Sequence, residues 1–417
     1  MEEKKSIKER CHVNTNEDGD RFVGIKANSE DAVVYFPLGY KLPESEADIR
    51  RDIKMLISVL SEYTEKKDRV LQMKKFEIAQ SVDFPINAYL EIINYYFSFG
   101  YYTENDPEYV TSSRGKADWP KTFKNQRPLI QQNGSPVYTQ MTVKKTTPND
   151  NKLITKIHKY CVYECFDKIG WLYVPNLPEK ADIAFNKNLF LSRLTDAMSN
   201  TFNDNHKRLF KAMIDVIKFL DEKPNEKEFF FGTDVFEYVW EKLIDKVFGI
   251  DNKQDYFPKT KWTLRYGHNR INNPLEPDTI MVYKDKVYVL DAKFYRYGAM
   301  SIPSATKLPH SSDINKQITY GQYINNHPDT GLKTDEDKLF NAFIMPFNQL
   351  NNAFGITEPF GNIGEATGDW IVNPKQFERI QGIVVDVRYL MKNRVGQPTD
   401  SIIKLAKAIE EGLATPI

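Results

Sequence analysis

The sequence is poor in cysteine, and this scarcity limits the class of protein that it can encode. Its 417 residues include three cysteines, Cys11, Cys161 and Cys165. Small secreted domains held together by disulfides need several paired cysteines, so a chain of this length with three does not fit that class. The composition favours a reducing compartment, and we predict a cytoplasmic protein.

Two further absences narrow the possible functions. No stretch approaches the apolar length that a membrane-spanning helix needs, about 20 residues, and the N-terminus is charged rather than signal-like. We therefore predict no membrane partner. No glycine-rich phosphate loop is present either, so the chain carries no recognisable nucleotide-hydrolysing motor of its own.

The chain also lacks net charge, because 57 basic residues balance 57 acidic ones. Proteins that bind nucleic acid are usually basic overall, so net charge gives no support for that function. The basic residues are unevenly placed, however. Residues 113–160 hold ten Lys or Arg against two acids, with Trp119, Phe123 and Tyr138 among them. Such a segment can follow a phosphate backbone or an acidic partner surface, or it can be an ordinary solvated face.

The most informative pattern lies at residues 276–293, where two apolar runs are framed by charged residues. Residues 279–283 and 287–290 are rich in β-branched and aromatic side chains, which predicts two strands. The polar break between them, residues 284–286, is short enough for a tight hairpin.

The hairpin would bring two carboxylates and one ammonium group together. With a turn centred on Asp285, Thr279 lies opposite Asp291, and Asp278 lies beside Asp291 at the open end. Asp291 and Lys293 share one face, because side chains alternate along a strand. Carboxylate oxygens suit Mg²⁺ (or Mn²⁺), which keeps several of its waters. We therefore predict a metal-dependent phosphodiesterase centre in which Asp278 and Asp291 bind the ion.

Lys293 would stabilise developing negative charge or help to deprotonate the attacking water. A second interpretation is an edge hairpin with solvated charges at its ends. The triplet Asp221-Glu222-Lys223 has the same acid-x-Lys pattern without flanking strands. The catalytic interpretation is favoured because charges that directly extend a hydrophobic strand cost burial energy unless a metal or partner compensates them.

A helix should precede the hairpin, over residues 233–249. Apolar residues recur there at helical spacing, and the expected buried stripe is Phe236, Val239, Trp240, Leu243 and Val247. Glu237 lies beside that stripe and is the predicted third metal ligand, with Glu241 as the next candidate. The alternative for Glu237 is a surface glutamate that pairs with a cation on the same helix.

Further candidate substrate contacts flank the hairpin. Residues 313–323 predict a helix on which Gln317 and Tyr320 could face the active centre or the DNA backbone, or could simply belong to an amphipathic helix. The basic stretch that leads into the hairpin contains Arg265 and Arg270. Its position beside the predicted metal site favours a DNA-facing role.

The order of predicted elements indicates the fold class. After the helix at 313–323, residues 340–347 and 380–390 are strand-like, and residues 401–411 form a helix. The order helix, hairpin, helix, strand, strand, helix predicts an α/β core (mixed α+β) with a mixed central sheet flanked by helices, preceded by an N-terminal mixed α/β binding region.

The chain is long enough for two or three domains. We predict a partner- or DNA-binding region over 1–220, divided into about 1–75 and 76–220, and a nuclease domain over 221–417. The seam is the polar stretch Asp221–Lys227. Within the first region, His158, Cys161 and Cys165 have a spacing that could suggest zinc, but no fourth ligand stands nearby, so we predict that they pack in a core.

Several of these motifs together resemble the PD-(D/E)XK nuclease superfamily. They are Phe236-Glu237-x-x-Trp240-Glu241, Pro277-Asp278, Asp291-Ala292-Lys293 and Gln317-x-x-Tyr320. Upstream, Arg114-Gly115-Lys116-x-Asp118-Trp119-x-x-Thr122 followed by a long helical stretch resembles the McrC type of restriction subunit. The most similar family is the LlaJI restriction endonuclease family.

The resemblance implies a prokaryotic restriction system that acts against phage. Its nuclease subunit would cut double-stranded DNA together with a separate McrB-like AAA+ GTPase ring, which the N-terminal half of the nuclease subunit contacts and stimulates. By motif position, Asp278 and Asp291 would be metal ligands and Lys293 the catalytic lysine, with Glu237 and Gln317 matched less closely.

For the partner contact the resemblance gives no residue-level match, and Arg114 and Trp119 are the candidates. Two other functions stay open from the sequence. One is a non-cleaving assembly or DNA-binding subunit that activates a partner NTPase. The other is a stand-alone DNA repair nuclease.

Overall fold

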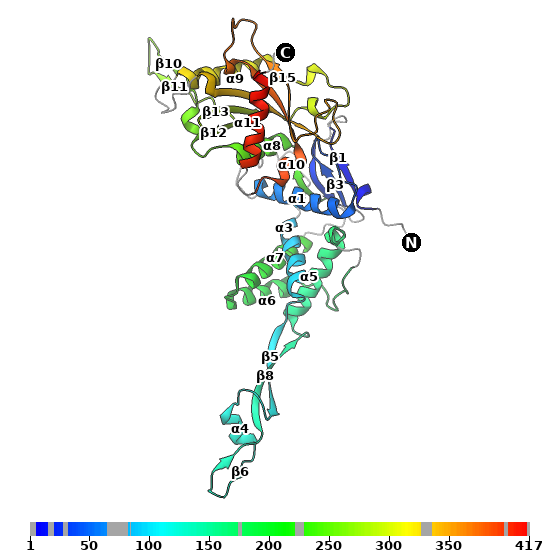
Figure 1. Ribbon diagram of the computed structural model, residues 1–417. Coiled ribbons are helices and arrows are strands. Elements are labelled where there is room, and N and C mark those ends of the chain that lie inside the picture. Colours follow the sequence, from blue (N-terminus) through cyan, green and yellow to red (C-terminus); the bar gives the residue numbers. More distant parts are fainter. Residues whose placement is uncertain are drawn as a thin grey trace. The chain divides into compact units, whose positions relative to one another are not determined.

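The protein divides into two compact units, here described from a computed structural model (Figure 1). The structure describes residues 6–15, 21–27, 32–64, 82–83, 85–173, 177–221, 229–326, 336–395 and 399–414. One unit joins Met1–Val82 to Glu228–Ile417, and the other is Asp83–Lys227. This grouping differs from the predicted boundary at 220/221. Apart from Asp221, the predicted seam lies outside the described residues.

The first unit contains two sheets and their covering helices. Its strands are β1 (Cys11–Val13), β2 (Val23–Ala27), β3 (Ala32–Phe36), β9 (Phe229–Thr233), β10 (Lys261–Trp262), β11 (Arg270–Ile271), β12 (Thr279–Tyr283), β13 (Lys286–Ala292), β14 (Leu339–Phe347), β15 (Phe360–Ala366) and β16 (Ile380–Asp386). Its helices are α1 (Glu46–Thr64), α8 (Phe236–Phe248), α9 (Ser311–Asn326), α10 (Val387–Lys392) and α11 (Thr399–Ala414).

A five-stranded mixed sheet forms the core of this unit, in the order β12-β13-β14-β16-β15. β13, β14 and β16 are parallel neighbours, and β12 and β15 are antiparallel at the two edges. β14 is buried along its whole length, as expected for a central strand covered on both faces. The predicted mixed α/β class is therefore confirmed.

Helices cover the two faces of this sheet. Tyr320 and Ile324 of α9 pack against Val289 of β13. The neighbouring Tyr288 reaches the other way, because its hydroxyl donates to Glu410 of α11 at 2.5 Å. Since successive side chains of a strand point to opposite faces, α9 and α11 lie on opposite sides of the sheet.

The β12–β13 hairpin has a tighter turn than the sequence analysis predicted. Tyr283 pairs with Lys286, which leaves a two-residue turn in which Lys284 has a φ of +57°. Such turns match the twist of the flanking strands. Thr279 therefore pairs with Leu290, and the predicted pairing of Thr279 with Asp291 is wrong by one residue. Continued outward, the observed register brings Asp278 directly opposite Asp291.

The predicted helices around the hairpin are confirmed. Every residue of the predicted stripe on α8 is buried, and α9 and α11 include the predicted helical ranges. The predicted strand at 380–390 is only partly correct. β16 ends at Asp386, whose side chain accepts a hydrogen bond from the Tyr389 amide and so caps helix α10.

A second sheet joins the N-terminal residues to the core domain, in the order β1-β3-β2-β9-β4, where β4 is Val82–Asp83. β2 pairs antiparallel with β9. Helix α1 is held by polar contacts to α10 and the residues after it. Arg388 donates two hydrogen bonds to Asp52, at 2.7 and 3.1 Å, and Arg394 donates to Ser58 at 2.6 Å. These long-range contacts explain why the first 82 residues group with the C-terminal part.

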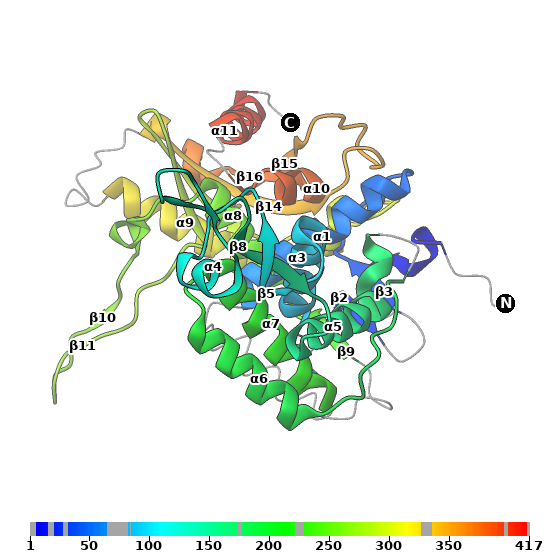
Figure 2. The same ribbon diagram turned by 90° about the horizontal axis from the view of Figure 1, so that it is seen from below.

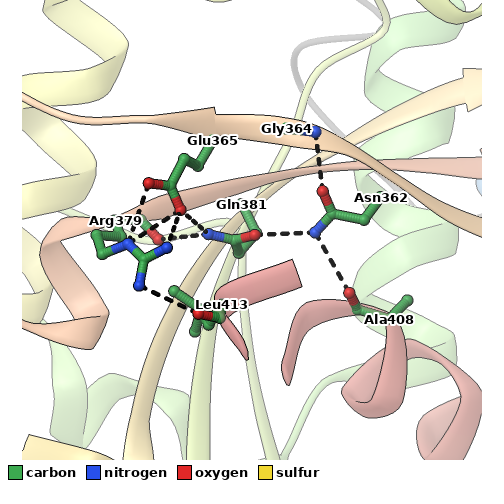
Figure 3. A network of polar contacts seen from close by, with 7 residues as sticks. All are labelled: Asn362, Gly364, Glu365, Arg379, Gln381, Ala408 and Leu413. Atoms are coloured by element: carbon green, nitrogen blue, oxygen red, sulfur yellow. Dashed lines mark hydrogen bonds and ion pairs between the residues drawn. The ribbon is translucent and has the colours of Figure 1, made fainter. Parts of the chain in front are cut away.

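The end of α11 is fixed to the sheet by a polar network (Figure 3). Arg379, the residue just before β16, pairs with Glu365 of β15 at 2.7 Å and donates to the Leu413 carbonyl at 3.2 Å. Asn362 donates to the Ala408 carbonyl at 3.3 Å and to Gln381 at 2.9 Å. The last helix is thereby locked against the antiparallel edge of the sheet.

The second unit is a group of helices from which a two-stranded ribbon extends (Figure 1). Its elements are α3 (Ile86–Phe99), β5 (Glu104–Ser112), α4 (Trp119–Asn125), β6 (Leu129–Ile130), β7 (Pro136–Val137), β8 (Met141–Asn149), α5 (Leu153–Ile169), α6 (Lys187–Asn200) and α7 (Asp204–Asp221). β5 and β8 pair antiparallel over their whole length, and α4, β6 and β7 lie at the far end of that ribbon.

The histidine and cysteines of α5 serve the core of this unit. His158, Cys161 and Cys165 are buried, and both cysteines are free thiols. The Tyr102 amide donates to His158 Nδ1 at 2.8 Å, and burial lowers the pKa of His158 to about 3. The prediction that these residues pack in a core is confirmed. Among the helices that the structure describes, none combines the length and hydropathy needed to cross a membrane.

Candidate active site

The open end of the β12–β13 hairpin gathers the residues that the sequence singled out. Asp278 precedes β12 and Asp291 lies near the end of β13. The Ala292 amide donates to Asp278 Oδ2 at 2.9 Å, which ties the first aspartate to the strand that carries the second. The convergence follows from the hairpin itself, because the observed register sets these two positions opposite each other.

Lys293 lies between two carboxylates. Its Nζ is 2.7 Å from Asp291 Oδ2 and 3.0 Å from Asp313 Oδ1 on α9. Asp291 is only 2% exposed. Burial opposes the charged ammonium, but Asp291 and Asp313 outweigh this effect and raise the pKa of Lys293 above its usual range. Lys293 is therefore a fixed cation at neutral pH.

The carboxylates of the site crowd one another. Burial, followed by the charges of Asp291 and Glu241, raises the pKa of Asp278 from 3.8 to about 7. Burial also raises the pKa of Glu241 on α8, to which the charge of Asp291 contributes while Lys293 opposes it. Excess negative charge in a poorly solvated place is what a bound cation relieves.

The residues fit a magnesium site in which few ligands come from the protein. Among the described residues, no group of three or more His, Cys, Asp or Glu side chains is placed to hold a metal ion. Mg²⁺ commonly binds through one or two carboxylates and retains waters, which matches Asp278 and Asp291. Asp291 Oδ2 is buried, has no hydrogen-bond partner among the described residues and forms an ion pair with Lys293, so a hard cation would find a dehydrated oxygen there.

Helix α9 supplies residues that the sequence analysis did not single out as site residues, Asp313 and Lys316. Burial opposes the charge of Lys316, but Tyr320, Asp291 and Asp278 outweigh it and raise the pKa of Lys316. Two lysines therefore border the carboxylates. Helical spacing could have revealed both residues in the sequence, because residues 313, 316, 317 and 320 share one face of a helix.

The two predicted substrate contacts on α9 are buried. The Gln317 amide donates to the Val289 carbonyl at 3.0 Å, so it braces the sheet. The Tyr320 hydroxyl donates to the Glu276 carbonyl at 3.0 Å and is 0% exposed as a residue. Tyr320 thereby holds the segment that carries Asp278.

Glu237, the predicted third ligand, lines a cavity of about 460 Å³. It lies one helical turn before Glu241, and its charge contributes to the raised pKa of Glu241. Of the two glutamates, only Glu241 contributes to the raised pKa of Asp278. The other polar groups of the cavity are the side chains of Asn14, Arg21, Arg296, Thr306, Lys307 and His310, together with Tyr295.

The remaining predicted residues belong to other elements. Arg265 and Arg270 are exposed on the β10–β11 hairpin. Arg114 and Trp119 belong to the second unit, where both are exposed near the end of the β5–β8 ribbon.

Comparison with known families now identifies the class of protein. The chain is a nuclease of the restriction type, because a family model described as LlaJI restriction endonuclease matches residues 22–364. This match covers most of the chain and includes the whole hairpin. The chain belongs to the LlaJI restriction endonuclease family, and membership implies DNA as its substrate. No curated protein matches the chain.

Proposed function

We propose that this protein is the Mg²⁺-dependent endonuclease subunit of a prokaryotic restriction system and that its core is a PD-(D/E)XK nuclease domain. The observation that carries the proposal is the convergence of Asp278, Asp291 and Lys293 at one end of a mixed sheet. The raised pKa values of Asp278 and Glu241 support a cation-binding site at the same place.

Each residue has a role in hydrolysing the phosphodiester bond. Asp278 and Asp291 would hold Mg²⁺, with Glu241 beside them. The ion would neutralise charge on the scissile phosphate and activate a water molecule. Lys293 stabilises the negative charge that develops in the transition state, since its raised pKa keeps it protonated. Lys316 adds a second positive charge at the edge of the site.

The surroundings of the site suit a polyanionic substrate. The cavity beside α8 presents Arg21, Arg296 and Lys307, and the β10–β11 hairpin presents Arg265 and Arg270. Cations spread over such a surface bind phosphates without regard to base sequence. They support double-stranded DNA as the substrate.

The second unit supports a protein partner, which we propose is an McrB-like AAA+ GTPase. Trp119 and Phe123 of α4 are 48% and 60% exposed, and their rings lie 5.6 Å apart. Leu129 and Ile130 of β6 are also exposed. Exposed apolar side chains on a segment that also carries exposed basic residues such as Arg114 are typical of a docking surface.

Cleavage assays with single variants test the nuclease proposal. Asp291→Asn and Lys293→Ala should each lower the rate of DNA cleavage at least about 100-fold with Mg²⁺, because each removes charge used in the transition state. Glu241→Gln should impair cleavage more than its matched control Glu237→Gln, which changes the same group one helical turn away. Circular dichroism checks that the variants fold.

Three results would contradict the proposal. Full cleavage by Asp291→Asn would show that the catalytic centre does not lie at this hairpin. Full restriction of phage by cells that carry the same variant would favour a non-cleaving assembly subunit, and cleavage without any partner gene would favour a stand-alone nuclease.

A further inference from the structure

The β10–β11 hairpin is an exposed basic ribbon beside the candidate active site. Lys261 pairs with Ile271 and Trp262 with Arg270, and Gly267 turns the chain with a φ of +91°. Both views show the hairpin projecting from the rest of its unit (Figure 1 and Figure 2). Every residue from 259 to 271 is exposed.

The charge of this hairpin has one sign. Residues 258–275 contain no Asp or Glu, and they contain Lys259, Lys261, Arg265 and Arg270 together with His268. None of the four cations forms an ion pair with any residue that the structure describes. Cations left without acidic partners on a projecting element lose little hydration and remain available to a polyanion.

Aromatic side chains are exposed between these cations. Trp262 is 61% exposed, and Tyr266 at the turn is 92% exposed. Folding leaves such large apolar surfaces in water where an interaction later covers them. Aromatic side chains exposed among cations can contact the base edges and thymine methyl groups of a duplex while the cations neutralise its backbone.

The base of the hairpin is fixed and lies close to the catalytic aspartate. The Leu275 amide donates to the Pro258 carbonyl at 2.8 Å, which closes the hairpin. Lys253 then donates to the Asp278 carbonyl at 2.8 Å. Asp278 follows Ile271 by seven positions in the chain, so their Cα atoms are at most about 25 Å apart. This distance is shorter than one turn of B-DNA, about 34 Å.

We propose that the β10–β11 hairpin enters the major groove of double-stranded DNA next to the cleaved bond. Lys261, Arg265 and Arg270 would contact phosphates, and Tyr266 would contact the bases. This inference rests on the proposed nuclease function and adds an element that grips the substrate. A two-stranded ribbon fits the major groove, which is about 12 Å wide. The hairpin itself carries no acidic residue, so its whole length can face a regular row of phosphates. DNA offers such a row, whereas the charges of an acidic protein are spaced less regularly.

Binding assays on the full chain in an Asp291→Asn background separate this inference from catalysis. The probe is a fluorescent 30-base-pair duplex, titrated at several salt concentrations without Mg²⁺. Arg265→Ala/Arg270→Ala should weaken binding at least tenfold and reduce the salt slope by about 2, one for each lost phosphate contact. Tyr266→Ala should weaken binding roughly tenfold without changing that slope.

A charge-matched control is available on α11, where Lys404 and Lys407 pair with Asp400 and Glu411 in the same helix. Lys404→Ala/Lys407→Ala should bind DNA as the parent does. The inference fails if the hairpin variants bind DNA like this control, or if they lose only self-association or binding to an acidic protein. If the parent chain binds DNA through the hairpin but wild type never cuts it, the nuclease proposal fails and the hairpin inference stands.

Discussion

At the scale of single residues, the site keeps a carboxyl group in an unfavourable environment. Asp278 is half-buried beside two other acids, and its pKa rises from 3.8 to about 7. Catalytic groups are often kept in such environments at the expense of stability. Without a cation, an ionised Asp278 destabilises the fold.

This environment predicts how stability depends on pH. Between about pH 4 and pH 7 the folded protein retains a proton on Asp278 that the unfolded chain has released, so the contribution of this group falls as pH rises and is lowest above pH 7. Asp278→Asn removes the charge. In EDTA it should raise the melting temperature at pH 8 by roughly 2–6 °C more than at pH 5.

Calorimetry of both proteins, with and without Mg²⁺, measures this difference. Added Mg²⁺ should stabilise wild type at pH 8 and leave Asp278→Asn little changed. An equal effect of the substitution at both pH values would show that Asp278 is not charged in a crowded site.

Whether a site residue could be predicted from the sequence depended on how far along the chain it lies from the other site residues. Asp278, Asp291 and Lys293 were predictable because a hairpin brings them together locally. The choice between Glu237 and Glu241 was not, since both lie on one side of a helix and only its packing angle places one near Asp291. Gln317 was chosen as a polar residue on a helix, yet its amide is used by a buried backbone carbonyl.

At the scale of elements, the edge of the sheet depends on a polar network rather than on apolar packing alone. Arg379 makes three contacts with Glu365, of which two are hydrogen bonds from Nε at 3.0 Å. Gln381 also donates to Glu365 at 3.0 Å. A planar guanidinium fits a carboxylate in this way, and a lysine does not.

Arg379→Met should destabilise the first unit by about 2–3 kcal/mol, because it leaves the Glu365 carboxylate partly buried without its counter-charge. Lys407→Ala, which removes an exposed pair with Glu411, should cost at most about 0.5 kcal/mol. Urea unfolding followed by fluorescence measures both. Adding Glu365→Leu to Arg379→Met should restore part of the loss, and a loss no larger than that of Lys407→Ala would contradict this account.

At the scale of the whole molecule, the two units do not follow each other along the chain. The sequence analysis divided the chain near residue 220, at a polar stretch. In the structure, the N-terminal residues complete the unit that holds the active site, since β2 pairs with β9 and Asp52 pairs with Arg388. The second unit is therefore inserted between two parts of the first.

This arrangement predicts which fragments fold. Residues 221–417 alone should aggregate or unfold, because they lack β2 and α1, including the buried Ile49, Ile53 and Leu56. A chain that joins residues 1–83 to 228–417 through a short glycine-serine linker should unfold cooperatively, since β4 and β9 are neighbours in one sheet. Circular dichroism melts of both fragments test this. Cooperative unfolding of residues 221–417 would contradict it.

The sequence by itself determined what is local: the mixed α/β class, the helices with clear periodicity, and the hairpin that sets two aspartates and a lysine together. These features depend on side-chain alternation and helical spacing over short stretches of chain. Tertiary structure decided the rest. Helix packing places Glu241 rather than Glu237 near the aspartates, and it places Asp313 and Lys316 beside them. Sheet pairing and helix contacts join the N-terminal and C-terminal parts of the chain in one unit. Such contacts join residues far apart in the chain, and the energy that selects them comes from packing that no local pattern encodes.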